Sequence, residues 1–227
     1  MFSRWLVRRD VIRADITADL PPVRMARQMK RALPAGDVSL LLAACPDKRA
    51  RAIVWLMVGC GLRCCEVSGL ETGDYDERGA TMFITGKGGH ERVVPVPSEV
   101  GVVLDAYLDE VGRGRGPLIR RSEYHRQRNR DRHEGLAADT VGGIVVEAMK
   151  AAGIKSRRRD GVSAHALRHT AASDVLDGCK DLRVVQQMLG HAHLATTAIY
   201  LREVDLGTMR EAMEGRTYSG DARSAVG

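Results

Sequence analysis

Long apolar runs are missing from this sequence, and its first ten residues, MFSRWLVRRD, contain no apolar core. A membrane-spanning helix needs about 20 consecutive apolar residues, and a signal peptide needs an apolar stretch of about 7 to 15. We therefore expect a cytoplasmic protein that does not enter a membrane. The hydrophobic fraction of 44% over 227 residues is still enough for the core of one large domain.

Cysteine is scarce, and its number is odd. An odd count in a chain without a signal peptide argues against a disulfide framework. Beside Cys60 and Cys64, no second pair of cysteine or histidine residues stands at zinc-finger spacing. We expect free thiols in or near the core at all five positions, which are Cys45, Cys60, Cys64, Cys65 and Cys179.

Lysine is also rare. Only six of the 35 basic residues are lysines, so 29 are arginines, and the formal net charge is +6. A guanidinium group can bind two phosphate oxygens at once, which an ammonium group cannot. The excess of arginine therefore favours a nucleic-acid partner. A GC-rich genome explains the same composition equally well, so composition alone does not establish a nucleic-acid partner.

Hydrophobic periodicity predicts a mostly helical chain with one small sheet. Residues 80–85 and 92–97 favour strands and flank the glycine-rich sequence GKGGHE, which predicts a hairpin. A short third strand is expected just before it. Asp37 and Asp47 precede periodic apolar segments, and we expect each to cap a helix. Further helices are predicted at 63–70, 97–111, 138–152, 164–178, 181–189, 194–201 and 205–214.

Two segments are strongly basic. Residues 113–132 hold eight arginines, and residues 155–160 read KSRRRD. Each is typical of a loop or a solvated surface segment. Such a charge run is equally compatible with a solvated loop and with a phosphate-contacting surface, and only a DNA-binding context favours contact.

The segment SAHALRHTAASDVLDG places polar groups on one helix face. His165 and Arg168 are three residues apart and so share a face. His169, four residues after His165, raises the possibility of zinc binding, but the glutamate of a metalloprotease helix and a third ligand are missing. Standing alone, these side chains would be interpreted as capping or salt-bridging groups.

Two other basic residues stand where an anion could bind. Arg63 follows a Gly-Leu step at a predicted helix start, where free N–H groups and the helix dipole favour an anion. Glu66 lies one turn further on, in a position to hold Arg63. Lys87 lies between glycines in the hairpin turn, where it either reaches outward to a ligand or is simply solvated.

The order of the motifs carries more information than any one of them. Four motifs follow one another along residues 34–214: R-x-x-E, a hairpin lysine, H-x-x-R, and L-G-H followed nine residues later by tyrosine. This arrangement resembles the tyrosine recombinases, the family of phage integrases and Xer-type site-specific recombinases. The segments SAHALRHTAASDVLDG and VVQQMLGHAHLATTAIYL match the family especially closely.

The resemblance implies that Arg63 and Arg168 clamp the scissile phosphate and that Glu66 supports them. Tyr200 would be the nucleophile that forms a 3′-phosphotyrosine. No metal and no cofactor are implied, because the guanidinium pair supplies the charge that magnesium would. The sequence also has no carboxylate cluster like that of a two-metal nuclease.

The remaining catalytic residues concern hydrogen bonding and proton transfer. His165 would act as the general base, and Lys87 would protonate the leaving 5′-oxygen. His191, after the Leu-Gly step, would hydrogen-bond the phosphate. His193, His169 and His90 match no catalytic position of the family.

The resemblance also implies the fold and its domains. We expect a mainly α fold with a small three-stranded antiparallel β-sheet, the fold of DNA breaking-rejoining enzymes. Residues 1–34 would be the end of a core-binding domain helix plus the interdomain linker. Residues 35–215 would be the catalytic domain including its C-terminal exchange helix, and residues 216–227 a disordered tail.

Double-stranded DNA is the implied partner. In the family the C-terminal helix docks on a neighbouring protomer, so we expect a homotetramer on DNA and a monomer without it, in which this helix is loose or packs on its own chain. The arginines expected to contact DNA are Arg113, Arg115, Arg120, Arg121, Arg157, Arg158 and Arg159.

Two alternatives share the same chemistry or fold. One is a DNA-binding module that is truncated or has lost catalysis, against which the complete set of motif residues argues. The other is a type IB topoisomerase-like enzyme, in which a lysine or arginine usually stands in place of His165.

Overall fold

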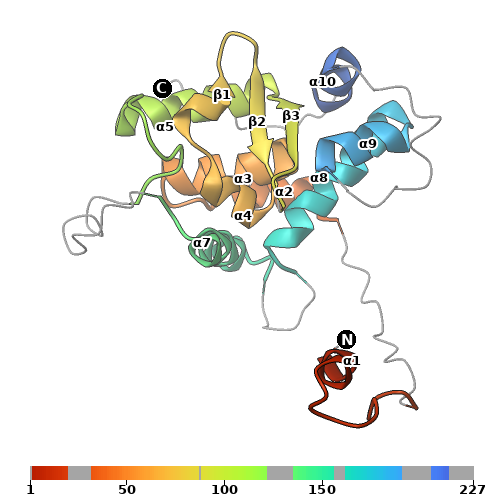
Figure 1. The fold of residues 1–227 in the computed structure, drawn as a ribbon. Coiled ribbons are helices and arrows are strands. Elements are labelled where there is room, and N and C mark those ends of the chain that lie inside the picture. Colours follow the sequence, from red (N-terminus) through yellow and green to blue (C-terminus); the bar gives the residue numbers. More distant parts are fainter. Residues whose placement is uncertain are drawn as a thin grey trace.

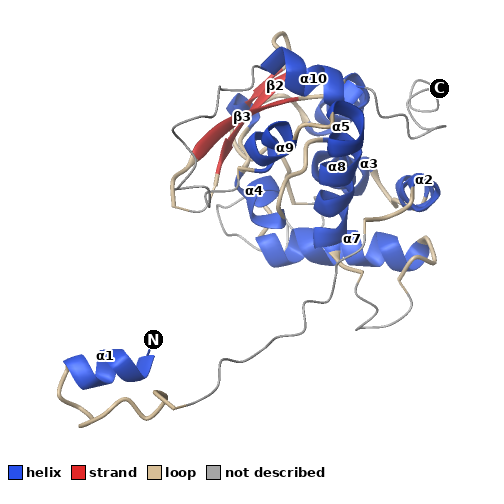
Figure 2. Cartoon of the chain, turned by 90° about the vertical axis from the view of Figure 1, so that its right-hand side faces the viewer, coloured by secondary structure: helices blue, strands red, loops and turns tan. Residues whose placement is uncertain are grey.

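The computed structural model describes residues 2–19, 32–86, 88–121, 135–155, 162–190 and 206–214. A small sheet lies at one side of the helices (Figures 1 and 2). The prediction of a mainly helical fold with three antiparallel strands is confirmed. None of the described helices is long and apolar enough to cross a membrane. The elements are α1 (Phe2–Arg8), α2 (Ala35–Ala43), α3 (Lys48–Gly59), α4 (Cys64–Gly69), η1 (Thr72–Asp74), β1 (Tyr75–Asp76), β2 (Thr81–Thr85), β3 (Glu91–Pro95), α5 (Ser98–Val111), α7 (Ala138–Ala151), α8 (Ala164–Cys179), α9 (Leu182–Leu189) and α10 (Leu206–Glu214).

Helix α3 forms the centre of the core and contacts α5, α7 and α8. Nine of its twelve residues are buried, Trp55 among them, as expected for a helix whose residues from Ala52 to Gly59 are all apolar. The Asp47 carboxylate caps its N-terminus by accepting a hydrogen bond from the Ala50 N–H at 2.7 Å. The prediction of this cap is confirmed.

Helix α2 differs from the prediction at its first turn. It begins at Ala35, and Pro34 occupies the N-cap position, so Asp37 lies inside the first turn. The prediction that Asp37 caps this helix is wrong. Its carboxylate nevertheless lies near the positive end of the helix dipole, where negative charge is stabilising.

The sheet has the order β1-β2-β3, and both strand pairs are antiparallel. Met82 and Ile84 of β2 are buried, whereas Phe83 between them is exposed, so one face of the sheet lies against the core. In the register of β3, Val94 lies opposite Met82 and Arg92 lies opposite Ile84. Because side chains alternate along a strand, Arg92 belongs to the core-facing side.

Helices α8 and α9 follow one another around a tight turn and confirm the helices predicted at 164–178 and 181–189. The Asp181 side chain begins α9 by accepting a hydrogen bond from the Arg183 N–H at 2.8 Å. Gly190 ends α9 with φ 61° and ψ 48°, a left-handed conformation that glycine adopts without steric cost.

The C-terminal helix α10 packs on its own chain, against α8, α9 and β3 (Figure 1). Met209 and Met213 are buried in this contact. The Glu214 carboxylate accepts hydrogen bonds from the N–H and the hydroxyl of Ser98 at 2.7 and 2.8 Å, at the N-terminus of α5. Without DNA, this helix is expected to be either loose or packed on its own chain. In this structure it is packed on its own chain.

All five cysteines are free thiols, as predicted, although Cys65 is exposed. Helix α1 lies away from the helices around the sheet in both views (Figures 1 and 2). The helix predicted at 194–201 and the tail 216–227 lie outside the described residues.

Candidate active site

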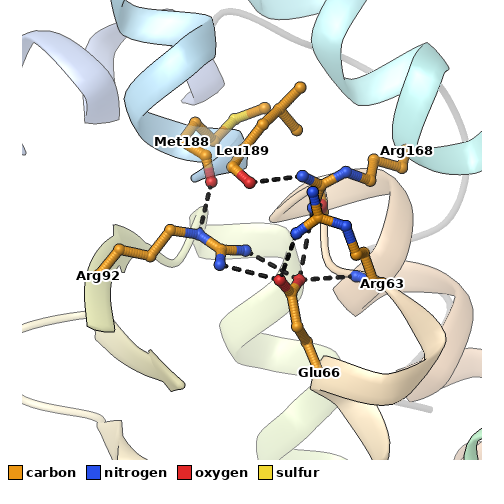
Figure 3. Close-up of polar contacts among 7 residues, drawn as sticks. Arg63, Glu66, Arg92, Arg168, Met188 and Leu189 are labelled. Atoms are coloured by element: carbon orange, nitrogen blue, oxygen red, sulfur yellow. Dashed lines mark hydrogen bonds and ion pairs between the residues drawn. The ribbon is translucent and has the colours of Figure 1, made fainter. Parts of the chain in front are cut away.

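A buried carboxylate, that of Glu66, forms the centre of the site (Figure 3). Glu66 lies in the first turn of α4, directly after Arg63 at the N-cap position. It accepts hydrogen bonds from the Arg63 N–H at 2.8 Å and from Arg63 Nη1 at 2.7 Å. These contacts hold the Arg63 side chain against Glu66, as the spacing of the two residues predicts. The supporting role of Glu66 in catalysis stays a prediction. The Arg63 side chain remains 32% exposed, so its guanidinium can still meet a ligand.

Arg168 reaches the same carboxylate from α8. Its Nη1 donates to the Gly61 carbonyl at 2.6 Å and lies 3.4 Å from Glu66 Oε2, and its Nη2 donates to the Leu189 carbonyl. The structure therefore brings Arg63 and Arg168 together, as the motif order predicts. The Arg168 side chain is only 4% exposed, so it is not the surface residue that its expected role in DNA contact suggests.

Arg92 is a member of the site that the sequence interpretation missed. Its Nη1 and Nη2 bind the two carboxylate oxygens of Glu66, each at 2.9 Å, and its Nε donates to the Met188 carbonyl at 2.9 Å. The signal was the alternation of ERVVPVP, because a strand that buries Val94 and Val96 turns Arg92 inward as well. An inward-facing arginine requires a charged partner.

One carboxylate is shared by three guanidinium groups, and their charges do not balance. Burial alone would raise the pKa of Glu66, but hydrogen bonds from Arg92 and from the Arg63 N–H outweigh it and lower this pKa to about 2. Burial, together with the nearby charges of Arg63 and Arg92, lowers the pKa of Arg168 to about 10. Arg168 stays protonated at neutral pH, and the surplus positive charge of the cluster favours an anion.

His165 lies one turn before Arg168 on α8, where it is exposed. Its ring contacts that of His169 edge to face, with centroids 5.6 Å apart. Both histidines and Arg168 line a cavity of about 290 Å³ between α8 and α9. In the part of the chain that the structure describes, no three His, Cys, Asp or Glu side chains gather closely enough to hold a metal ion.

Three of the predicted catalytic residues cannot be compared with the structure. Lys87, His191 and Tyr200 lie outside the described residues, as does the basic segment with Arg157, Arg158 and Arg159. The role of each stays a prediction.

The remaining arginines predicted to contact DNA lie in the segment after α5, and several are bound to the protein itself. Arg113 pairs with Glu77, Asp105 and Asp109. Arg120 donates to the carbonyls of three residues, which are Val111, Gly114 and Pro117. Arg121 donates to the Gly135 carbonyl at 3.0 Å, whereas Arg115 is exposed. Their contact with DNA stays a prediction.

The chain is similar to several known proteins. The model of the phage integrase family matches residues 31–205. The tyrosine recombinase XerD of Corynebacterium glutamicum is 32% identical over 212 residues, which cover 90% of this chain and 67% of that protein. The tyrosine recombinase XerA of Thermococcus kodakarensis is 34% identical over 86% of this chain and 66% of its own length.

Solved structures give the same result. The integrase from mycobacterium phage Brujita aligns with the whole chain and 73% of its own, with a TM-score of 0.66 and 25% identity. The XerA recombinase aligns with a TM-score of 0.61 and 29% identity, over 79% of this chain and 62% of its own. The chain belongs to the phage integrase family and is a DNA strand-transferring enzyme of the tyrosine recombinase class.

Proposed function

We propose that this chain cuts and rejoins DNA at a specific site through a covalent 3′-phosphotyrosine on Tyr200. The observation that supports this proposal is the cluster of Arg63, Glu66 and Arg168, whose surplus positive charge suits a phosphodiester. In-line attack by an oxygen builds negative charge on the non-bridging oxygens of the phosphate. Guanidinium groups held in place beforehand stabilise that charge more than they stabilise the ground state.

The chemical step requires two proton transfers. A tyrosine hydroxyl ordinarily has a pKa of about 10. Tyr200 must therefore give up its proton to attack, and His165 accepts it as general base. The phenolate oxygen forms a bond to phosphorus, and the bond from phosphorus to the 5′-oxygen breaks. Lys87 protonates this leaving oxygen. A 5′-hydroxyl of another strand later attacks the phosphotyrosine, so a new phosphodiester bond forms, the bond from phosphorus to Tyr200 breaks, and the tyrosine is released.

The proposed assembly is a homotetramer on DNA in which α10 docks on a neighbouring protomer. Among the structures with the same fold is a lambda integrase tetramer bound to a Holliday junction. Burial of Met209 and Met213 in this chain is consistent with a helix that needs an apolar partner surface, in cis or in trans. We further propose the division into residues 1–34, 35–215 and 216–227, and a cytoplasmic location.

A nicked suicide substrate carrying the recognition site tests the proposed function. A nick beside the scissile phosphate lets the short leaving strand diffuse away, so the covalent complex accumulates on a denaturing gel. We expect an adduct with the wild-type chain and none with Tyr200→Phe. Absence of the wild-type adduct would support the alternative of a catalytically inactive module. Relaxation of supercoiled plasmids that lack the site would instead support a type IB topoisomerase-like enzyme.

A further inference from the structure

We propose that Arg92 is a positioning residue for DNA cleavage, one that fixes the phosphate-binding arginines and the end of α9 relative to one another. This inference rests on the proposed function. Arg92 comes from β3, its carboxylate partner Glu66 from α4, and its carbonyl partner Met188 from α9 (Figure 3). A single side chain thus joins three elements of the site.

The geometry of Arg92 uses the whole guanidinium fork. Nη1 and Nη2 take one oxygen each of the Glu66 carboxylate, and Nε is left to bind the Met188 carbonyl. This bidentate pairing fixes the plane of the carboxylate. The same two oxygens bind Arg63 and approach Arg168. By orienting Glu66, Arg92 therefore also helps to position both of these predicted clamp residues.

Arg92 also acts on the C-terminus of α9. The last carbonyls of a helix have no partner inside it and attract positive charge. Here the Met188 carbonyl accepts from Arg92, and the next one, that of Leu189, accepts from Arg168. Two arginines therefore hold the end of the helix, two residues before His191 in the sequence.

Gly190 has no side chain and so leaves room for Arg92. A Cβ atom at this position would lie 2.9 Å from Arg92 Cδ and 3.1 Å from Nη1. Three hydrogen bonds hold that side chain, so it could move aside only by giving up partners. A methyl group at position 190 would disturb the Arg92 contacts without changing Arg92 itself, and it would also strain the left-handed backbone of Gly190.

Electrostatics argue against a merely structural tie. Arg92 is 11% exposed and lies close enough to Arg168 for its charge to lower the pKa of Arg168. An apolar side chain could connect β3 and α9 without this repulsion. A third guanidinium here adds to the surplus positive charge. A bound phosphate would neutralise this charge, so the repulsion among the three arginines would be relieved when DNA binds.

The experiment compares single-turnover cleavage of two substrates, one with an ordinary scissile phosphate and one with a methylphosphonate there. The methylphosphonate lacks the negative charge that the clamp neutralises. We expect Arg92→Gln to lower the cleavage rate of the ordinary substrate by about 100-fold, since small misplacements of catalytic groups have effects of this size. The defect should shrink to less than about 10-fold on the methylphosphonate, as it should for Arg168→Ala, because a neutral phosphate depends less on the clamp.

Three further variants keep the inference testable. Arg92→Lys keeps the positive charge but loses the guanidinium fork, so it should show the same substrate-dependent defect. Gly190→Ala should show this defect too. If Arg92→Gln does not fold, Arg92→Lys takes its place in the experiment. Arg78→Gln, an exposed position in the turn before β2, is the matched control and should cleave both substrates at the wild-type rate. An equal defect on both substrates, or full activity in Arg92→Gln, would overturn the positioning role. Failure of the wild-type chain to form any adduct would overturn the proposed function instead.

Discussion

Two arginine-rich regions of this molecule use the same side chain in opposite ways. In the site, three guanidinium groups from three elements share the single carboxylate of Glu66. In the segment after α5, Arg113 alone has three carboxylates, and Arg120 uses its N–H groups on backbone carbonyls. The first region keeps a surplus of positive charge, whereas Arg113 and Arg120 of the second are neutralised or bound internally. The number of arginines in a segment therefore does not measure its capacity to bind a phosphate.

The largest expected difference concerns the rate of cleavage. Arg168→Ala should lower the single-turnover cleavage rate by about 10² to 10³, because it removes a charged donor from the transition state. It should also lower the free energy of unfolding by about 1 to 3 kcal/mol, because the Gly61 and Leu189 carbonyls lose their donor. Arg113→Ala, measured at saturating DNA and by denaturant unfolding, is the matched control and should change neither quantity much. Equal losses in the two variants would contradict the proposed difference between the two arginine-rich regions.

Replacement of the shared carboxylate tests the same contrast through stability. Glu66→Gln leaves three guanidinium groups close together without a counter-ion. We expect the free energy of unfolding to fall by about 3 kcal/mol, as is typical when one partner of a buried ion pair is removed. Asp109→Asn, which removes one of three carboxylates around Arg113, should cost less than about 1 kcal/mol in the same urea titration. A Glu66→Gln chain as stable as the wild type would contradict the central role of this carboxylate.

The pH dependence of stability follows from the lowered pKa of Glu66. Because this pKa falls from an ordinary value near 4.5 to about 2 on folding, the ionised carboxylate stabilises the fold fully above about pH 4.5. That contribution is lost as the pH falls from there through about 2. Wild-type stability should therefore drop more steeply than that of Glu66→Gln between pH 5 and pH 2, when unfolding is followed by circular dichroism. Parallel curves for the two proteins would show that the carboxylate is not stabilised by its arginines.

The smallest expected effect concerns Arg115, which is exposed in the segment after α5. If it contacts a phosphate, as the sequence predicts, Arg115→Gln should lower the slope of log affinity against log salt by about one. Cleavage at saturating DNA should not change. Arg120→Gln should instead reduce stability, because its N–H groups hold the chain after α5 together. An unchanged salt dependence in Arg115→Gln would remove this residue from the DNA-contacting set.

The sequence revealed those parts of the site that depend on local order. Arg63 and Glu66 lie within one helical turn, so their contact follows from spacing alone. Arg168 was identified from its motif, but its burial depends on how α8 meets α9, which spacing does not encode. Arg92 was missed because its partners lie 26 and 96 residues away, and only the inward alternation of β3 pointed to it.

One helix start was also predicted wrongly. Asp37 and Asp47 look equally suited to cap a helix in the sequence, yet only Asp47 does so. Pro34 is an extended residue directly before α2, which lets that helix begin before Asp37 is reached. The start of α2 therefore follows Pro34, and an aspartate before an apolar segment was the wrong signal there.

The most direct test of the central claim is a structure of Tyr200→Phe bound to duplex DNA that contains the recognition site. This variant cannot form the covalent bond, so the uncut phosphate should stay in place. We expect the non-bridging oxygens of the scissile phosphate to lie about 3 Å from the guanidinium nitrogens of Arg63 and Arg168, with Glu66 and Arg92 still paired behind them. A scissile phosphate bound elsewhere, away from these two arginines, would contradict it.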